Sequence, residues 1–249
     1  MRAVVIVIAS ALSAGCAATN EKVSFLPKPQ QEAIIRDGNP ALVSKQKNSI
    51  VLIRPASRGV PSHGRPVFVV GITNLSGSPI TFTVANVGAW QSVNQQRASL
   101  KVITYEDLVS EERTRQVASA VMVGLAGAAN AYSASQAGNY TSHSTVYTPR
   151  GTYNVQTTGY SPTAAAIAQS NANAQNAAMI SSTVERGQQN LAALEATVIK
   201  DNTIMPNEWY GGQLHLQPPE SDSAGKTYTI AIKVGSDLHE IDIQQVATR

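Results

Sequence analysis

The residues that could act as nucleophiles, acid–base catalysts or metal ligands are few in this chain and lie far apart. It has four histidines, one cysteine and 16 acidic residues in 249 positions. The set nearest to a metal site is His215, His239 and Asp242, but zinc sites need three or four converging ligands and this spacing matches no common pattern. We therefore expect His215 and His239 to be surface or strand-edge residues that hold no metal.

Sequence signatures of catalysis and nucleotide binding point the same way. The chain contains no Gly-x-Ser-x-Gly segment, which would place a serine nucleophile on a sharp turn. The glycines of Gly211-Gly212 and Gly124-Leu125-Ala126-Gly127 match neither of the glycine-rich loops that hold phosphates. The neighbouring carboxylates Glu111 and Glu112 suit the solvated start of a helix, where acidic side chains complement the helix dipole. The sequence thus predicts a protein that is not an enzyme and needs no cofactor.

The only cysteine, Cys16, follows a segment with the properties of a secretory signal. Arg2 is followed by an apolar run shorter than the ~20 residues that a membrane-spanning helix needs. The residues Leu12-Ser13-Ala14-Gly15-Cys16 resemble the lipobox of bacterial prolipoproteins. This resemblance implies cleavage before Cys16, acyl chains such as palmitate on that cysteine and, because Ala17 follows it, sorting to the outer membrane. The alternative is an ordinary signal peptide with a coincidental cysteine.

Charge and cysteine content bear on two further properties. Lys and Arg number 19 against 16 acidic residues, and the basic residues form no stripe, so the sequence has no electrostatic footprint for nucleic acid. A single cysteine leaves none to pair in a disulfide, so hydrophobic burial must hold the fold together.

Two groups of strand signals flank a long alanine-rich segment. Ile80, Phe82 and Val84 alternate with polar residues, and the segment from Tyr228 to Val234 does the same near the other end of the chain. The segment Val69 to Phe82 is similar to the immunoglobulin-like modules of bacterial envelope proteins. We expect an α+β fold in which one immunoglobulin-like β-sandwich is interrupted by a long helical hairpin, with two separate domains as the alternative.

The domain boundaries follow from these patterns. We predict a signal peptide at 1–15, a lipidated N-terminus and flexible tether at 16–47, sandwich strands at 48–104 and 206–249, and an inserted helical hairpin at 105–205 with a Tyr-, Thr- and Ser-rich tip loop at 138–161. The tether is predicted because prolines at 27, 29 and 40 disfavour regular structure, apart from a short helical turn at Gln31 to Arg36. Within the tip loop, Pro149-Arg150-Gly151 suits a type I turn between two short strands.

The expected hairpin is almost free of charge. Arg150 is the only charged residue between Gln116 and Val184, whereas an exposed helix face normally carries Lys and Glu. Small residues recur every four positions at Ala120, Gly124 and Ala128, a spacing that lets helices approach closely. The second helix has an a/d pattern that predicts a partner helix, made by Ile180, Val184, Gly187, Leu191, Leu194 and Val198.

Tyrosines gather at the expected tip. Four of the eight tyrosines in the chain, Tyr140, Tyr147, Tyr153 and Tyr160, lie within 21 positions. Tyrosine is enriched at protein interfaces, where it offers a large contact area at low entropic cost. We therefore predict Gly124, Ala128 and these four tyrosines as interaction residues.

The leading hypothesis from the sequence is a non-enzymatic envelope lipoprotein, attached to the membrane by its N-terminal lipid. Its role would be structural or in protein interaction, with the hairpin binding another copy or another envelope protein. A first alternative is a subunit of an oligomeric envelope assembly, such as a secretion or surface-appendage apparatus. A second is a ligand-binding or hydrolytic lipoprotein.

The lipid anchor can be tested by the substitution Cys16→Ala. One acyl chain binds a membrane only marginally and stable attachment needs more than one, so losing the acylated cysteine should move the protein out of the membrane fraction. Fractionation of cells expressing each form measures this. Unchanged membrane association of the Cys16→Ala protein would contradict the lipobox assignment.

Overall fold

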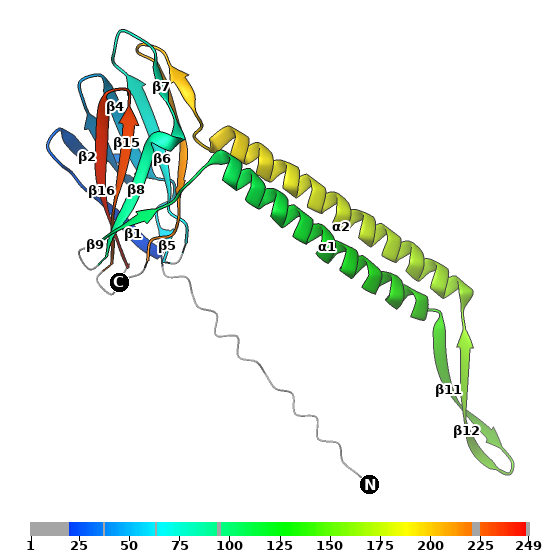
Figure 1. Cartoon of the computed structure of the whole chain (residues 1–249). Helices are drawn as coiled ribbons and strands as arrows, with labels where there is room; N and C mark the ends of the chain where they lie inside the picture. The colour runs from blue at the N-terminus through cyan, green and yellow to red at the C-terminus, as the bar shows by residue number, and fades with distance from the viewer. Residues whose placement is uncertain (1–19, 37, 63, 94–95, 221–224, 248–249) are drawn as a thin grey trace. The chain divides into compact units, whose positions relative to one another are not determined.

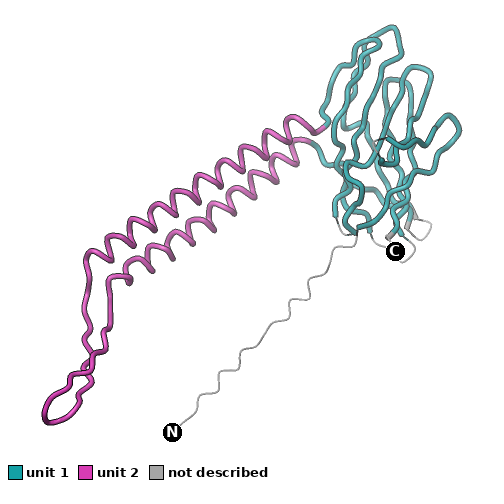
Figure 2. The backbone as a smooth tube through the Cα atoms, turned by 180° about the vertical axis from the view of Figure 1, so that it is seen from behind, with its two compact units in different colours: residues 1–104, 199–249 teal, residues 105–198 magenta. Residues whose placement is uncertain are grey.

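The chain divides into two compact units, which are described separately. The computed structural model describes residues 20–247 except 37, 63, 94–95 and 221–224. The first unit is formed by the chain before Tyr105 and after Val198, and the second by Tyr105–Val198 (Figure 2). The predicted signal peptide and Cys16 lie outside the described residues.

Antiparallel sheets make up the first unit (Figure 1). One six-stranded sheet has the order β5 (Val60–Pro61), β1 (Asn20–Leu26), β16 (Asp237–Ala247), β15 (Lys226–Val234), β8 (Val87–Val93) and β9 (Gln96–Leu100). A second has the order β10 (Val102–Ile103), β14 (Trp209–Leu216), β6 (Val67–Asn74), β4 (Ser49–Pro55), β3 (Asn39–Lys45) and β2 (Gln31–Arg36). A small two-stranded sheet pairs β7 (Ile80–Phe82) with β13 (Asn202–Ile204).

Both large sheets contribute to one hydrophobic core. Along β4 and β15 the inward positions are buried, as alternation with period two requires. The rings of Phe68 on β6 and Tyr228 on β15 meet edge to face, with centroids 6.2 Å apart. Strands from before and after the helical segment supply this core, among them β4 with Ile53 and β16 with Ile241. The two ends of the chain therefore form a single folded unit, and the predicted α+β class with a helical hairpin is confirmed.

The prediction of a flexible tether up to residue 47 is wrong from residue 20 onward. Strands β1, β2 and β3 occupy this segment, and β1 pairs with β16 over six residues. Val23 and Phe25 of β1 enter the core, and Glu21 forms an ion pair with the buried Lys226 of β15, 2.9 Å from Oε2 to Nζ. The helical turn predicted at Gln31 to Arg36 is strand β2.

The prolines that predicted a tether lie at or next to the ends of these strands. Pro27 and Pro29 lie in the connection between β1 and β2, and Pro40 is the second residue of β3. A proline near a strand end costs few ladder hydrogen bonds, so it is compatible with a sheet. Ala41 and Leu42, which follow Pro40 directly, are fully buried.

The second unit is a helical hairpin that ends in a two-stranded ribbon. Helix α1 (Tyr105–Gln136) and helix α2 (Pro162–Thr197) run antiparallel, and β11 (Asn139–Thr148) pairs with β12 (Gly151–Tyr160) between them. Ser161 caps α2 by accepting a hydrogen bond from the Ala164 amide at 3.3 Å, and Pro162 occupies the first helical position. Local sequence signals thus define the start of α2.

The shared core predicts that the first unit folds without the hairpin. We expect a Gly–Ser linker in place of residues 106–197 to leave a cooperatively unfolding β protein, with a melting temperature within about 5 °C of the full chain. Ile199 must be kept, because it is buried and its amide donates to the Gln213 carbonyl. Circular dichroism during heating measures the transition.

A matched truncation provides the control. Residues 206–249 alone lack β1, β4 and β6, so they should show no cooperative transition. A stable fold of that fragment would contradict the single-core description.

Candidate functional site

The contact between α1 and α2 is made by small and polar residues. On α1 the buried and partly buried positions of this interface are Leu108, Glu112, Gln116, Ser119, Val123, Gly127, Asn130 and Ala134. On α2 they are Ala165, Ala168, Ala172, Asn176, Met179, Thr183, Gly187, Asn190 and Leu194. We call these two sets the interhelical interface. It contains few large apolar side chains, so close approach and hydrogen bonds must hold the helices together.

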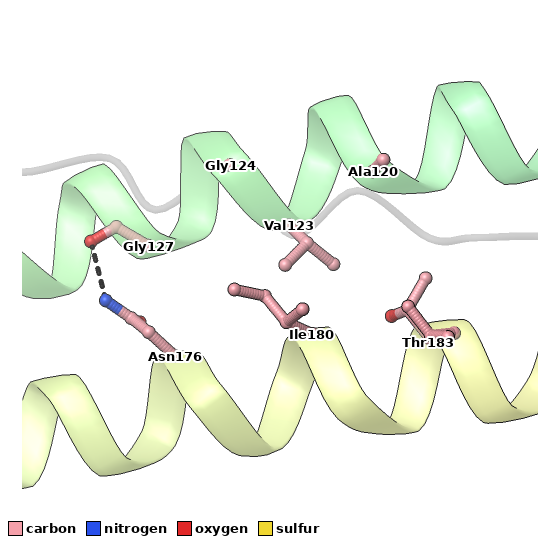
Figure 3. Close-up of a pocket in the computed structure, with 8 residues that line it drawn as sticks. Ala120, Val123, Gly124, Gly127, Asn176, Ile180 and Thr183 are labelled. Atoms are coloured by element: carbon pink, nitrogen blue, oxygen red, sulfur yellow. Dashed lines mark hydrogen bonds between the residues drawn. The ribbon is translucent and has the colours of Figure 1, made fainter.

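Amide side chains connect the helices at two glycines. Asn176 donates a hydrogen bond to the Gly127 carbonyl at 3.3 Å, as Figure 3 shows. It also accepts one from Asn130 at 2.9 Å. Gln116 donates to the Gly187 carbonyl at 3.1 Å. A Cβ atom at residue 187 would lie 2.8 Å from the side-chain amide carbon of Gln116, so a larger residue there would displace that bond.

Glu112 is the one acidic residue of the interface, and only 5% of it is exposed, so the prediction of a solvated carboxylate is wrong for this residue. Its carboxylate accepts hydrogen bonds from Asn190 at 3.1 Å, from Gln116 at 3.2 Å and from Arg115. Burial alone would raise the pKa of Glu112, but these donors stabilise the anion and hold its pKa below the ordinary value.

The interface repeats every eleven residues. Glu112, Val123 and Ala134 are separated by eleven, and so are Ala172, Thr183 and Leu194. An eleven-residue repeat stays in phase with a nearly straight helix, whereas a heptad pattern drifts by ~20° per repeat.

Because of this drift, only part of the a/d pattern predicted for α2 faces α1. Gly187 and Leu194 lie in the interhelical interface, Leu191 is partly buried, and Val198 is buried just beyond the end of α2. Ile180 and Val184 are more than half exposed and line an open groove at the edge of the interhelical interface.

Leu108 and Val123 of α1 lie in the interface, but most of the large apolar side chains of this helix face outward. Val117, Val121, Leu125, Ala128 and Tyr132 follow one another at intervals of four, four, three and four, and all are exposed. We call these five residues the outer stripe. Its four large side chains are between 59% and 71% exposed. Contiguous exposed apolar surface of this kind is typical of an interaction site.

A shallow apolar groove runs along one side of the helix pair. It has a volume of about 260 Å³ and is lined by Ala120, Val123, Gly124, Gly127, Asn176, Ile180, Thr183 and Val184 (Figure 3). A Cβ atom at Gly124 would meet nothing within 4 Å. Of the two small residues predicted for close packing, Gly124 therefore lies open in the groove and Ala128 on the outer stripe, and neither is part of the contact with α2.

Two further features of the second unit are the length of α1 and the exposure of the tyrosines on the ribbon. Within the described part of the chain, α1 alone is long and apolar enough to cross a membrane, on length and composition only. The four tyrosines predicted as interaction residues are all on the ribbon and more than half exposed.

The first unit contains a buried cluster of chemistry-bearing residues that the sequence did not reveal. His239 is fully buried, so its expected place at the surface is wrong. Its Nε2 lies 2.9 Å from Ser49 Oγ and its Nδ1 lies 2.9 Å from Ser44 Oγ. Ser49 donates to Asp237 Oδ2 at 2.8 Å. These bonds connect β16 of one sheet with β3 and β4 of the other.

The direction of each hydrogen bond follows from Asp237. Its carboxylate can only accept hydrogen bonds, so the Ser49 hydroxyl donates its hydrogen to Asp237. The Ser49 oxygen must then accept a hydrogen bond from His239 Nε2–H. Nδ1 is then the acceptor for the Ser44 hydroxyl. The Ser49 oxygen therefore has its hydrogen directed to a carboxylate rather than to a histidine base, and the chain of bonds joins the sheets instead of activating a nucleophile.

The metal set considered from the sequence does not converge. His239 points into the core from β16, whereas Asp242 accepts from Thr229 at 2.7 Å and forms an ion pair with Lys28 at 3.2 Å. His215 belongs to the other sheet, on β14. Among the described residues, no group of three or more His, Cys, Asp or Glu side chains is placed to hold a metal ion.

Comparisons with protein-family models, with curated proteins and with solved structures found no match.

The buried cluster predicts that acid destabilises the first unit. Burial disfavours the charged imidazole and outweighs the attraction of Asp237, so the pKa of His239 is lowered to about 4. An unfolded chain binds this proton near pH 6.5. Between pH 6.5 and about pH 4 the unfolded chain binds this proton but the folded chain does not, so the free energy of unfolding falls as the pH falls through this range. We expect a loss of about 3 kcal/mol in the free energy of unfolding, measured by urea titration at pH 7 and pH 4.

Two variants separate this effect from general acid sensitivity. His239→Gln removes the titrating group and should flatten the pH dependence, while His215→Gln should keep the wild-type slope. An unchanged slope in His239→Gln would contradict the assigned role of His239.

Proposed function

We propose that this protein is a lipid-anchored, non-enzymatic component of the bacterial envelope whose helical hairpin binds a second copy of the chain. One observation about the hairpin carries the proposal. Mostly small and polar residues fill the interhelical interface, whereas the large apolar side chains of the outer stripe face outward. A helix in water gains most of its stability by burying its apolar face, and within the described residues of this unit the outer stripe is left without cover.

The spacing of the outer stripe suits a partner helix. Intervals of three and four place Val117, Val121, Leu125 and Tyr132 along one side of α1, as in helices that pack side by side. Fully burying a Val or Leu side chain contributes ~1.5–3 kcal/mol. The lack of charge between Gln116 and Val184, apart from Arg150, means that few ionic groups would lose water when two copies meet.

A second copy is the partner that we favour because the groove and the stripe complement each other. The groove beside Gly124 is open and apolar, and the outer stripe offers side chains such as Leu125 that fit such a space. Each copy carries both features, so one mode of contact can serve two or more copies.

The envelope location and the finer fold are part of the proposal. The lipobox-like segment ending at Cys16 and the following Ala17 support attachment to the outer membrane. For the first unit we propose an immunoglobulin-like β-sandwich, supported by two antiparallel sheets that share one core.

A subunit of an oligomeric envelope assembly is the second candidate function. A specific observation favours it: the ribbon of β11 and β12 has all but one of its residues exposed, and its two strands lie in a sheet of their own. An isolated two-stranded hairpin is marginally stable in water, so this ribbon calls for additional contacts.

Self-association can be tested by placing charges on the outer stripe. We expect the full-length wild type, extracted in mild detergent, to have a mass by light scattering of two or more copies. Val121→Glu with Leu125→Glu should shift it to a single copy, because burying carboxylates is costly. Gly124→Leu should weaken association by filling the groove without disturbing α2.

The control places the same charges elsewhere on the hairpin. Ser170 and Ala174 are exposed on α2 with the same spacing of four, so Ser170→Glu with Ala174→Glu should keep the wild-type mass. A wild-type monomer whose hairpin amides are protected in hydrogen exchange would refute the proposal, since the hairpin would then be stable without a partner.

A further inference from the structure

The ribbon of β11 and β12, which we call the tip ribbon, is amphipathic in a way that the sequence alone does not reveal. Its strands pair in continuous antiparallel register from Asn139↔Tyr160 to Thr148↔Gly151. Directly paired residues lie on the same face, and successive residues alternate between faces. The register therefore sorts the twenty paired residues into two sets of ten.

One face is more apolar than the other. The apolar face carries Tyr140, Val146, Tyr153 and Val155 among Ser, Thr and Gly residues. The polar face carries Asn139, Thr141, His143, Thr145, Asn154, Gln156 and Thr158, with Thr152, Tyr147 and Tyr160. Neither face has a Lys, Arg, Asp or Glu residue, and Arg150 sits in the turn.

The strand length matches a lipid bilayer. Each strand has 10 residues, and membrane-spanning strands have ~9–11. Ten residues rise ~33 Å along the strand, and a tilt of ~40° reduces this to ~25 Å, the height of the apolar band of membrane β-barrels.

Aromatic residues lie near both ends of the ribbon. Tyr140 and Tyr160 are next to the helices, and Tyr147 and Tyr153 are next to the turn. Of these four, Tyr140 and Tyr153 are on the face with Val146 and Val155, one at each end of the ribbon. Membrane barrels carry aromatic girdles at the two lipid–water interfaces in the same way. Arg150 in the turn would reach the far headgroups, where lipid phosphates can accept its hydrogen bonds.

The unpaired outer edges of β11 and β12 limit how the ribbon could enter a lipid bilayer. Each strand is hydrogen-bonded on one side only, so along its outer edge alternate backbone N–H and C=O groups lie outside the ladder. Water can bond to these groups but hydrocarbon cannot, so strands cross a bilayer only as closed barrels. A two-stranded ribbon cannot close by itself, and identical ribbons from other copies are the simplest partners.

We propose that the tip ribbon is the membrane-inserting part of a β-barrel built by several copies of this chain. Each copy contributes β11 and β12, with the face of Val146 and Val155 toward the acyl chains and the face of Thr145 and Gln156 lining the lumen. Barrels with an aqueous channel have about 16–18 strands, which corresponds to about eight or nine copies that contribute two strands each. The inference rests on the self-association proposed above and names the membrane as the partner of the tip.

The test compares two arginine variants at neighbouring positions of β12. Val155→Arg places the charge on the face assigned to lipid, and Gln156→Arg places it on the face assigned to the lumen. The full-length protein is added from mild detergent to vesicles of phosphatidylethanolamine and phosphatidylglycerol that hold a self-quenching dye. The wild type should release dye, Val155→Arg should reduce release by about tenfold or more, and Gln156→Arg should keep it within about twofold.

A second readout reports burial in lipid directly. With a polarity-sensitive dye on Val155→Cys or Gln156→Cys, only the dye at 155 should shift its emission to the blue on adding vesicles. Equal effects of the two arginines, or a water-like signal at both positions, would overturn the membrane assignment.

The mass of the protein in detergent, measured by light scattering, shows whether the barrel hypothesis fails alone or together with the proposed self-association. Oligomers that release no dye would refute the barrel while leaving self-association intact. A monomeric wild type that releases no dye would refute both.

Discussion

The antiparallel packing of α1 on α2 is the constraint on which the second unit depends. Residues at eleven-residue intervals form the contact, and most of the interface residues are small or are amides that bond across it, such as Asn130 and Asn176. Contact through these residues leaves room for few large side chains between the helices. Val121 and Leu125 must therefore face outward, and the hairpin acquires an apolar exterior as a direct result of its polar interior.

The first unit is organised in the opposite way. Its core of apolar residues is contributed by both sheets, and a chain of hydrogen bonds runs through buried polar residues from Ser44 through His239 and Ser49 to Asp237. A buried polar network is favourable only when each member has its partner. The two units therefore differ: the first buries its apolar side chains in a core, whereas the hairpin and its tip ribbon leave apolar side chains exposed.

Self-association and membrane insertion would complement each other physically. Copies that meet through the outer stripe would bring several tip ribbons together, which raises their effective concentration for edge pairing. Strand pairing would in turn satisfy the backbone groups along the edges of β11 and β12. An N-terminal lipid anchor at Cys16 would keep these copies at a membrane surface, so the three features describe one assembly.

Local properties of the sequence determined the fold class, the helical hairpin, its cap at Ser161 and its scarcity of charge, because period, composition and capping act within a few residues. Tertiary structure alone decided that β1 joins the core, since its six-residue pairing with β16 involves partners more than two hundred positions away. It also decided that His239 is buried, because Ser44 and Ser49 reach it from the other sheet. For the same reason, only the packed helices show that Gly124 lies open and that the outer stripe faces away from α2: a helix can turn any face to its neighbour, and the contacts choose among them.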